Sequence, residues 1–365
     1  MPREIHLRLR RLRLRMEQTG TDAFAVLHLP NVFYLSGFTG SAGALFVEQS
    51  SATLFTDGRY KTQSREELRG TGVIASISRG SALSALGAHL AARKGRGVMR
   101  VGFDPTHVTF AGQSALEREA GRRIRWRPET GWVEEMRAIK SVAELAQMRR
   151  AAGLISEVFE KVVNFVRPGT TELELAAEVD YQMRKLGAEG PSFDTIVASG
   201  SRGALPHARP TSKRLKRKGL VVLDMGAILG HYCSDMTRTL CLGKAPKRVK
   251  TWYQAVLEAQ AAAIEALGVG VEAGAPDLAA RRVLASFKLD KYFVHSTGHG
   301  LGIEVHEDPR LAAGQKGPLQ AGMVVTVEPG VYVEGVGGIR IEDDVAILSR
   351  GTRTLTTAPR GLLEL

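Results

Sequence analysis

The apolar side chains near the start of the chain recur with the period of a helix. They are Ile5, Leu9, Leu12 and Met16, at intervals of four, three and four residues. Arginines fill the other faces, and the segment lacks the continuous apolar stretch of a signal peptide. The pattern predicts the amphipathic first helix of a folded domain, in preference to a cleaved targeting segment.

Short apolar runs then predict strands that alternate with helices as far as residue 103. The first three runs are residues 23–29, 44–49 and 51–57. Between the first two, residues 30–43 are rich in glycine and serine and predict a loop that carries Phe33, Tyr34 and Phe38. This alternation is typical of an α/β domain.

A change of rhythm near residue 132 predicts a domain boundary. Pro128 and Gly131 interrupt the pattern, and a long helix follows in which Ser141 and Glu144 fit a capping box. Beyond it, helices and antiparallel-looking strands occur without βαβ alternation. We therefore expect an α/β domain at residues 1–132 and an α+β domain at residues 133–365.

Composition excludes several classes of function. The chain has 365 residues, 44% of them hydrophobic, which is enough for a sizeable core, and no apolar run is long enough to span a membrane. Its two cysteines offer no disulfide framework, as is common in the reducing cytoplasm. The net charge of +12 is compatible with nucleic-acid binding. However, the arginines are scattered, and the densest basic run, residues 212–219, reads as a solvated loop before a strand. We expect no membrane partner and no specific nucleic-acid partner.

Residues 220–243 predict a β-hairpin that carries two aspartates. If the turn centres on Leu229 and Gly230, Asp224 lies directly opposite Asp235, with Cβ atoms about 5 Å apart. Two such carboxylates need a proton, a basic partner or a metal ion. The alternatives are a register that differs by a residue, or one aspartate facing solvent beside Arg238.

Further acidic residues follow on two predicted strands near the C-terminus. The strand at residues 324–328 ends in Glu328, and a second strand spans residues 338–348, where Arg340, Glu342 and Asp344 share one face. Because buried, unpaired carboxylates are strongly disfavoured, one or two divalent cations would explain them. An oxygen-rich donor set suits manganese or cobalt, with zinc as a further candidate.

Three histidines lie close together in residues 295–307, namely His295, His299 and His306. His299 stands between Gly298 and Gly300 and so outside any regular helix, which excludes the zinc-binding helix motif HExxH. We expect the glycines to let the backbone approach an ion and a substrate. The remaining histidines, with His207, would then be proton-transfer or hydrogen-bonding groups beside that ion.

Several motifs together resemble the pita-bread metallopeptidases, in particular the branch of aminopeptidase P and prolidase. In chain order they are VLDMGA, YCSDMTRT, HSTGHGLGIEVHE, VVTVEPGVY and GGIRIEDD. A looser likeness covers residues 192–207 and 31–43. The resemblance spans nearly the whole chain and implies a creatinase-like α/β N-terminal domain followed by an α+β pita-bread catalytic domain.

The same resemblance implies a site with two divalent metal ions, Mn²⁺ first and Co²⁺ or Zn²⁺ as alternatives. Its metal ligands would be Asp224, Asp235, His299, Glu328 and Glu342. Its catalytic residues would be His207, His295, His306, Glu328 and Arg340. The ions would activate a water, Glu328 would take its proton and His295 would donate to the oxyanion. His207 and His306 would position the proline, and Arg340 would orient Glu342.

The implied function is hydrolysis of the Xaa-Pro bond at the N-terminus of dipeptides or short peptides, in the cytoplasm. The implied assembly is a homodimer, with a tetramer as the alternative, in which residues 31–41 are a candidate lid over a neighbour's site. Ordinary packing of these aromatic residues is the alternative to a lid. Two other functions stay open: a methionine aminopeptidase-like exopeptidase and a basic, noncatalytic binding module. The choice between dipeptidase and aminopeptidase also stays open.

Overall fold

A computed structural model describes residues 2–94 and 97–365 of the chain. The chain forms two compact units, Met1–Arg137 and Ala138–Leu365. The division falls at the end of helix α6 (Trp132–Ala138), a few residues beyond the predicted boundary between residues 132 and 133.

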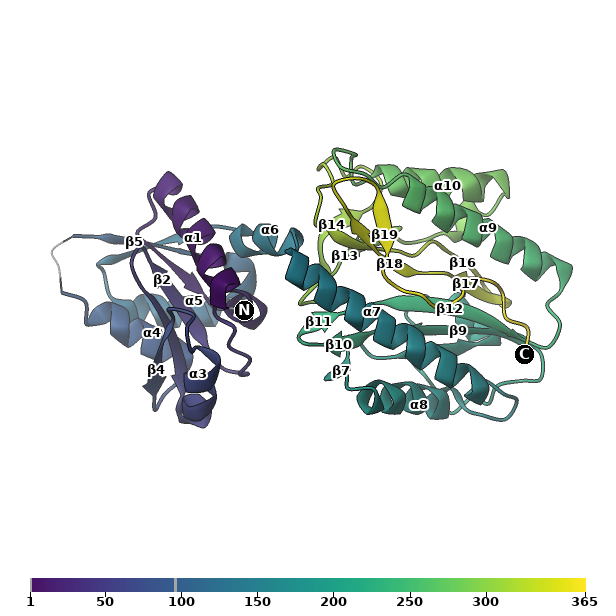
Figure 1. The fold of residues 1–365 in the computed structure, drawn as a ribbon, viewed down its shortest axis with the longest axis horizontal. Coiled ribbons are helices and arrows are strands. Elements are labelled where there is room, and N and C mark those ends of the chain that lie inside the picture. Colours follow the sequence, from purple (N-terminus) through teal and green to yellow (C-terminus); the bar gives the residue numbers. More distant parts are fainter. Residues whose placement is uncertain (1, 95–96) are drawn as a thin grey trace. The chain divides into compact units, whose positions relative to one another are not determined.

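The first unit is a six-stranded sheet with helices, as the α/β pattern predicts (Figure 1). The strand order is β4-β3-β2-β1-β5-β6, and β1 pairs antiparallel with β2 but parallel with β5. The strands are β1 (Ala23–Val26), β2 (Ala44–Glu48), β3 (Ala52–Asp57), β4 (Ile74–Ser78), β5 (Met99–Phe103) and β6 (Ile124–Pro128). The helices besides α6 are α1 (Pro2–Thr19), α2 (Leu29–Ser36), α3 (Lys61–Glu67), α4 (Ala82–Ala91) and α5 (Phe110–Ala120), with short 3₁₀ turns η1 (Gly58–Tyr60) and η2 (Pro105–His107). The predicted amphipathic first helix is confirmed, since its four periodic apolar side chains are buried.

The prediction of a loop over residues 30–43 was wrong in its first half, which forms helix α2. Pro30 lies in the first turn, where its missing N–H costs nothing, and Gly37 ends the helix in the left-handed conformation with φ 79°. The aromatic side chains of Phe33, Tyr34 and Phe38 are buried within this unit. These side chains therefore pack in the core of the unit. Such ordinary packing is the alternative to the lid.

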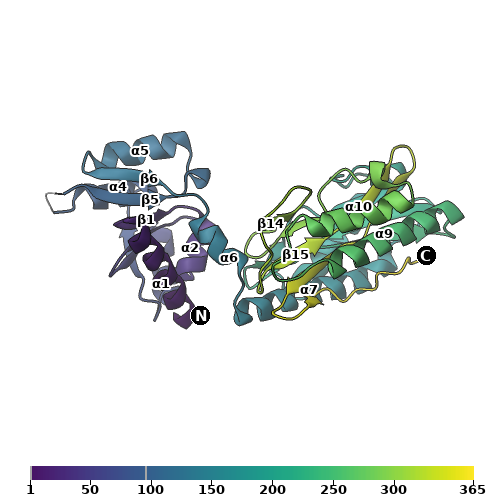
Figure 2. The ribbon, with the colours of Figure 1, turned by 90° about the horizontal axis from the view of Figure 1, so that it is seen from above.

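The second unit places its strands between two pairs of helices. The helices are α7 (Val142–Val162), α8 (Glu172–Lys185), α9 (Lys247–Glu265) and α10 (Ala275–Ser286), with 3₁₀ turns η3 (Val163–Phe165), η4 (Gly200–Ala204) and η5 (Asp290–Tyr292). Figures 1 and 2 show α9 and α10 side by side on the outside of the strands. One hydrophobic core lies beneath α9 and α10, and another lies beneath α7 and α8. The predicted capping box of Ser141 and Glu144 begins α7.

Four small sheets make up the strand layer of this unit. Their orders are β12-β9-β8, β14-β13-β15-β18-β19, β16-β17 and β11-β10-β7. The strands are β7 (Gly190–Pro191), β8 (Ile196–Ser199), β9 (Gly219–Met225), β10 (Ala227–Leu229), β11 (Tyr232–Cys233), β12 (Met236–Leu242), β13 (Gly298–Gly300), β14 (Glu307–Leu311), β15 (Val324–Val327), β16 (Gly330–Val333), β17 (Gly337–Arg340), β18 (Asp343–Ile347) and β19 (Thr352–Thr354). Because β12 is buried along its whole length and β9 is buried from Leu220 onward, the functional side chains on them lie in the interior.

The hairpin at residues 220–243 forms, but its predicted register was wrong by two residues. Asp224 lies opposite Thr237, not opposite Asp235. The turn consists of Gly230 and His231, with φ 55° and 65°. Two consecutive residues with positive φ are the signature of a two-residue type I′ turn. The dipeptide Gly-His is not one of the pairs that indicate this turn in a sequence. A shift of two residues preserves the face of each side chain, so both aspartates still point to the same side.

The predicted single strand at residues 338–348 is in fact two strands, β17 and β18, that belong to different sheets. The chain leaves the β16–β17 pair at Ile341, and the backbone N–H of Glu342 donates to Thr237 O of β12 at 3.1 Å. The break therefore turns Glu342 towards β12.

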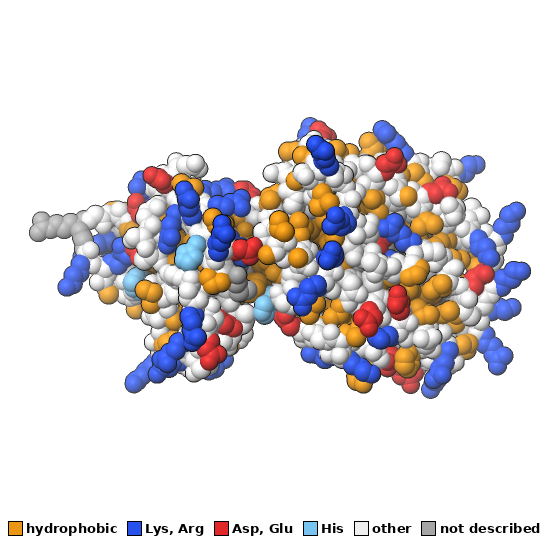
Figure 3. All heavy atoms as spheres, in the orientation of Figure 1, with side chains coloured by type: hydrophobic (Ala, Val, Ile, Leu, Met, Phe, Trp, Pro, Cys, Tyr) orange, Lys and Arg blue, Asp and Glu red, His pale blue; other side chains and the backbone are white. Residues whose placement is uncertain are grey.

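No helix among the described residues is long and apolar enough to cross a membrane. Figure 3 shows lysine and arginine side chains spread over the visible face instead of gathered in one patch.

Candidate metal centre

The structure brings five potential ligands from separate strands together inside the second unit. Asp224 lies on β9 and His299 on β13, while the other three stand at strand ends or breaks. Ligand atoms of Asp235, His299 and Glu342 all lie within 4.8 Å of one another. The Nε2 atom of His299 is 3.7 Å from Asp235 Oδ2 and 3.6 Å from Glu328 Oε1. The predicted ligands thus meet although the register that suggested them was wrong.

Burial and mutual repulsion disfavour the charged forms of these carboxyl groups. The pKa values of Asp235 and Glu342 are raised well above the usual range, first by burial and then by neighbouring carboxylates that include Asp224. Burial also raises the pKa of Glu328 to about 8, against the opposing charge of Arg340. Among the described residues, Asp224 Oδ1 and Asp235 Oδ1 are buried without a hydrogen-bond partner. Buried acceptors of this kind normally have a partner, so the donor set fits a divalent cation.

His299 is held in the form that binds metal ions. Its Nδ1–H donates to Gly300 O at 3.0 Å, which leaves the Nε2 lone pair facing the carboxylates. Burial lowers its pKa to about 4, so the ring is neutral at neutral pH. The flanking glycines allow close packing against neighbouring backbone. A Cβ on Gly298 would lie 1.9 Å from Thr326 O, and one on Gly300 would lie 2.2 Å from Asp308 O.

Two threonines that sequence reasoning missed orient the carboxylates. Thr237 donates from Oγ1 to Glu342 Oε2 at 2.6 Å and accepts from Arg340 Nε at 2.9 Å. Thr326 donates to Glu328 Oε1 at 3.4 Å. Arg340 therefore acts on Glu342 through Thr237, while its Nη2 pairs directly with Asp224. A threonine on a strand is ordinary in sequence, so only the fold identifies these partners.

The hydrogen bonds of His295 do not support its predicted role as an oxyanion donor. Its Nδ1 lies 2.8 Å from Ser296 O, and its Nε2 lies 2.8 Å from the Tyr332 hydroxyl. Burial lowers the His295 pKa to about 4, so the ring carries one N–H, and a carbonyl can only accept. The hydrogen therefore lies on Nδ1, and Nε2 accepts from Tyr332. In this arrangement no N–H of His295 is left for an oxyanion.

Tyr332 is a third residue that the sequence did not single out. Its oxygen accepts from Arg340 Nη1 at 2.9 Å while its hydrogen points to His295 Nε2. Burial raises the pKa of Tyr332 to about 12, which keeps the hydroxyl protonated. An aromatic residue on a strand is normally read as core, so only its two polar neighbours show its place in the site.

His207 and His306 lie at the exposed edge of this centre. The ring of His306 is 4.4 Å from the ring of His299, measured between centroids. Burial and the charge of His207 lower the pKa of His306. Arg340 Nη1 donates to Pro206 O at 3.2 Å and so ties the loop of His207 to the centre. All the predicted site residues therefore lie in one region of the second unit.

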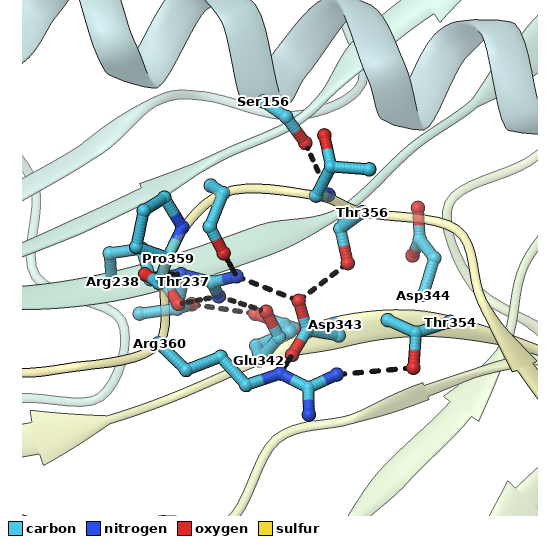
Figure 4. Close-up of polar contacts among 12 residues, drawn as sticks. Ser156, Thr237, Arg238, Glu342, Asp343, Asp344, Thr354, Thr356, Pro359 and Arg360 are labelled. Carbon is cyan, nitrogen blue, oxygen red and sulfur yellow. Dashed lines mark hydrogen bonds and ion pairs between the residues drawn. The ribbon is translucent and has the colours of Figure 1, made fainter.

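A buried polar network around Arg238 and Asp343 fixes the backbone at Glu342 (Figure 4). Arg238 is only 1% exposed and donates from Nη2 to Asp343 Oδ1 at 2.7 Å and from Nη1 to Glu342 O at 2.6 Å. Arg360 donates to the other oxygen of Asp343 at 2.6 Å. The alternative that placed an aspartate of the hairpin in solvent beside Arg238 is therefore wrong.

A second group of potential ligands lies in the first unit, at His28, His107 and Glu134. The rings of His28 and His107 stack with centroids 3.7 Å apart and planes only 4° from parallel. An imidazole binds a metal ion in the plane of its ring, and one ion cannot lie in two parallel, separated planes. The stacked arrangement therefore does not form a metal site.

The metal-stripped protein is expected to lose stability as pH rises from about 6.5 to about 8. A carboxyl group whose pKa is higher in the folded state, as for Glu328 at about 8, stabilises the fold while protonated and loses that contribution as pH rises through this value. Below 6.5 the buried histidines act in the opposite sense, because their pKa values are lowered from 6.5 to about 4. Thermal melts across this range, with and without Mn²⁺, would measure the effect. A stripped protein whose melting temperature stays level or rises over this window would contradict it.

Comparisons with known proteins place both units in known families. Residues 146–349 match metallopeptidase family M24, and residues 8–139 match the creatinase/prolidase N-terminal domain. The Xaa-Pro dipeptidase of Pyrococcus horikoshii is 34% identical over 349 residues, covering 95% of this chain and 96% of the relative. The solved structure of an Xaa-Pro dipeptidase from Bacillus anthracis has a TM-score of 0.93 at 35% identity and covers 99% of this chain and 100% of its own. An X-Pro aminopeptidase from Thermotoga maritima has a TM-score of 0.89 at 34% identity, covering 98% of this chain and 99% of its own.

These likenesses extend over both units and include the predicted two-domain architecture. The chain therefore belongs to metallopeptidase family M24, as a peptidase with a creatinase-type N-terminal domain and a pita-bread catalytic domain.

Proposed function

We propose that this metallopeptidase is an exopeptidase that hydrolyses the Xaa-Pro bond at the N-terminus of dipeptides or short peptides. The observation that carries the proposal is the buried cluster of four carboxylates around neutral His299, which lacks sufficient counter-charge without metal. The relatives named Xaa-Pro dipeptidase and X-Pro aminopeptidase support the choice of substrate.

The residues proposed to hold two divalent ions are Asp224, Asp235, His299, Glu328 and Glu342. Four oxygen donors to one nitrogen favour Mn²⁺, with Co²⁺ or Zn²⁺ as alternatives. When bound, such ions lower the pKa of a coordinated water so that hydroxide forms near neutral pH. Thr237 and Thr326 keep Glu342 and Glu328 oriented for this purpose.

Glu328 is proposed to take the proton of the attacking water. Its only hydrogen bond among the described side chains is the long one from Thr326, so an oxygen is available to receive that proton. The N–H groups of His207 and His306 are proposed to face the oxyanion and the proline end of the substrate, since the N–H of His295 is engaged. His295 and Tyr332 instead fix Arg340, which positions Asp224 and Thr237.

Replacing Tyr332 by phenylalanine tests the positioning role of the hydroxyl. We expect kcat to fall about tenfold, since a buried polar group left without its partner costs about 1–3 kcal/mol. The metal content should stay unchanged, because Tyr332 touches none of the five proposed ligands in the hydrogen bonds described above. Kinetics on Ala-Pro together with metal analysis would measure both quantities. An unchanged kcat, or a loss of metal, would refute this positioning role of Tyr332.

Hydrolysis of Ala-Pro and Ala-Pro-Ala by metal-stripped protein, before and after addition of Mn²⁺, tests the proposed function. The bond before proline is a tertiary amide without an N–H, so peptidases that require this donor cleave it poorly. Metal-dependent cleavage of the dipeptide alone would make the enzyme a dipeptidase, and preference for the tripeptide would make it an aminopeptidase. Failure to cleave either peptide with metal bound would refute the proposed substrate.

A homodimer, with a tetramer as the alternative, is proposed on the resemblance described above, and sedimentation of the full chain would test it. A cytoplasmic location is proposed because Cys233 and Cys241 are both unpaired and buried. Burial raises the pKa of the Cys233 thiol to about 12, so this side chain is unreactive.

A further inference from the structure

The densest basic segment of the sequence lines a cleft on the second unit. The cleft has a volume of about 180 Å³ and lies between the start of η4 and the segment that leads into β9. Three lysines line it, Lys213, Lys216 and Lys218. None of the proposed metal ligands and none of the histidines of the metal centre borders it. The cleft is therefore separate from the peptidase site.

The positive charges at this cleft are not neutralised by the protein. No carboxylate lines the cleft, and within residues 2–94 and 97–365 none of the three lysines forms an ion pair with an acidic side chain. The only hydrogen bond described for their ammonium groups joins Lys213 Nζ to Ser199 O at 3.2 Å. Three lysines without an ion-pair partner line one concavity, and their positive charges raise the local potential and attract anions.

The carboxylate of Glu172, which contacts the cleft residue Ser199, already has several hydrogen-bond donors. Glu172 is completely buried and accepts from the backbone N–H and the hydroxyl of Ser199, at 2.9 and 2.8 Å, and from Arg202 at 3.1 Å. This carboxylate fixes the wall of the cleft without offering charge to the lysines.

Further polar groups and the backbone shape complete the cleft. Ser201, which carries a hydroxyl group, is also among its lining residues. Gly200 and Gly219 also line it, with φ 57° and 137°, conformations in which a side chain would be strained. The rim therefore has a backbone shape that depends on glycine at two positions. The volume is well above the roughly 10–15 Å³ that one water occupies by the same measure.

We propose that this cleft binds a phosphate-class oxyanion, either free phosphate or diphosphate or the diphosphate of a nucleotide. Lysine ammonium groups act on phosphate as point charges and do not require the planar geometry that arginine offers to carboxylates. Three ammonium groups with a serine hydroxyl match a ligand that carries two or three negative charges on tetrahedral centres. This binding is independent of peptide hydrolysis.

Titration calorimetry of the metal-stripped full-length chain with pyrophosphate tests the proposal, because the stripped protein avoids chelation of active-site metal. We expect one ligand per chain, and binding about tenfold weaker in the double variant Lys216→Gln/Lys218→Gln, since each charge-assisted contact is worth more than a neutral one. Both lysines are exposed, so the variant should fold normally, and its melting temperature checks this. Lys316→Gln, at an exposed position of another loop, removes one such charge away from the cleft and should bind like the unmodified protein.

Equal binding by the double variant, or equal weakening in Lys316→Gln, would overturn the proposal, since attraction would then follow net charge alone. ADP identifies the source of the ligand. Tighter binding of ADP than of pyrophosphate, lost in the double variant, assigns the cleft to a nucleotide. Binding of ADP no tighter than that of pyrophosphate assigns it to the free anion.

Discussion

Replacing Glu328 by glutamine is expected to lower kcat for Xaa-Pro hydrolysis by about 10²–10⁴-fold, the usual contribution of a general base. Glutamine has the same shape, but it cannot take a proton and carries no negative charge towards a metal ion. Glu328 Oε1 lies 3.6 Å from His299 Nε2, and the hydrogen bond from Thr326 to Glu328 is long, at 3.4 Å. Kinetics on Ala-Pro, with the metal content of the same sample, would measure the effect.

The matched control for this variant is Glu334→Gln. Glu334 is exposed in the turn between β16 and β17, only six residues from Glu328, and the change of charge is the same. We expect activity close to that of the unmodified protein. A Glu328→Gln variant that retains its metal and hydrolyses Ala-Pro at nearly the original rate would refute the assignment of the base.

Replacing Arg238 by methionine is expected to destabilise the catalytic unit by about 3–5 kcal/mol, because a buried charge pair is broken. The guanidinium group pairs with Asp343 and donates to four backbone carbonyls, those of Thr237, Glu342, Ala358 and Pro359. Arg360 would still contact Asp343, but it does not reach these carbonyls in the hydrogen bonds described above. The melting temperature should fall by roughly 6–20 °C for a unit of this size.

The control for Arg238→Met is Arg353→Met, an exposed arginine on β19. Its effect should stay within about 0.5 kcal/mol. Equilibrium unfolding in urea of both variants would measure the difference. A loss below about 1 kcal/mol for Arg238→Met would show that the network behind Glu342 does not hold the fold.

The parts of the fold that were predictable from the sequence are those in which a local rule and the tertiary structure agree. Helix α1 follows its apolar period, and α7 begins at a capping box that needs only Ser141 and Glu144. Helix α2 was missed because its residues resemble a loop, and only burial of its aromatic side chains against the rest of the unit makes it helical.

The candidate ligands could be named from sequence because acidic residues on buried strands stand out chemically, whatever the register. Their arrangement could not be named. The turn at His231 required a positive φ in a non-glycine residue, and the break at Glu342 depends on hydrogen bonds from β12 and Arg238. The tautomer of His295 follows from its two hydrogen-bond partners, and these partners could not be identified from the sequence.

The most direct test of the proposed Xaa-Pro specificity compares hydrolysis of Ala-Pro and Met-Ala by one Mn²⁺-loaded preparation and by the same protein stripped of metal. We expect that only the loaded protein cleaves Ala-Pro and that neither preparation cleaves Met-Ala. Cleavage of Met-Ala with Ala-Pro left intact would contradict it and would indicate a methionine aminopeptidase-like specificity. Bound metal without turnover of either peptide would contradict it as well, in favour of a noncatalytic binding module.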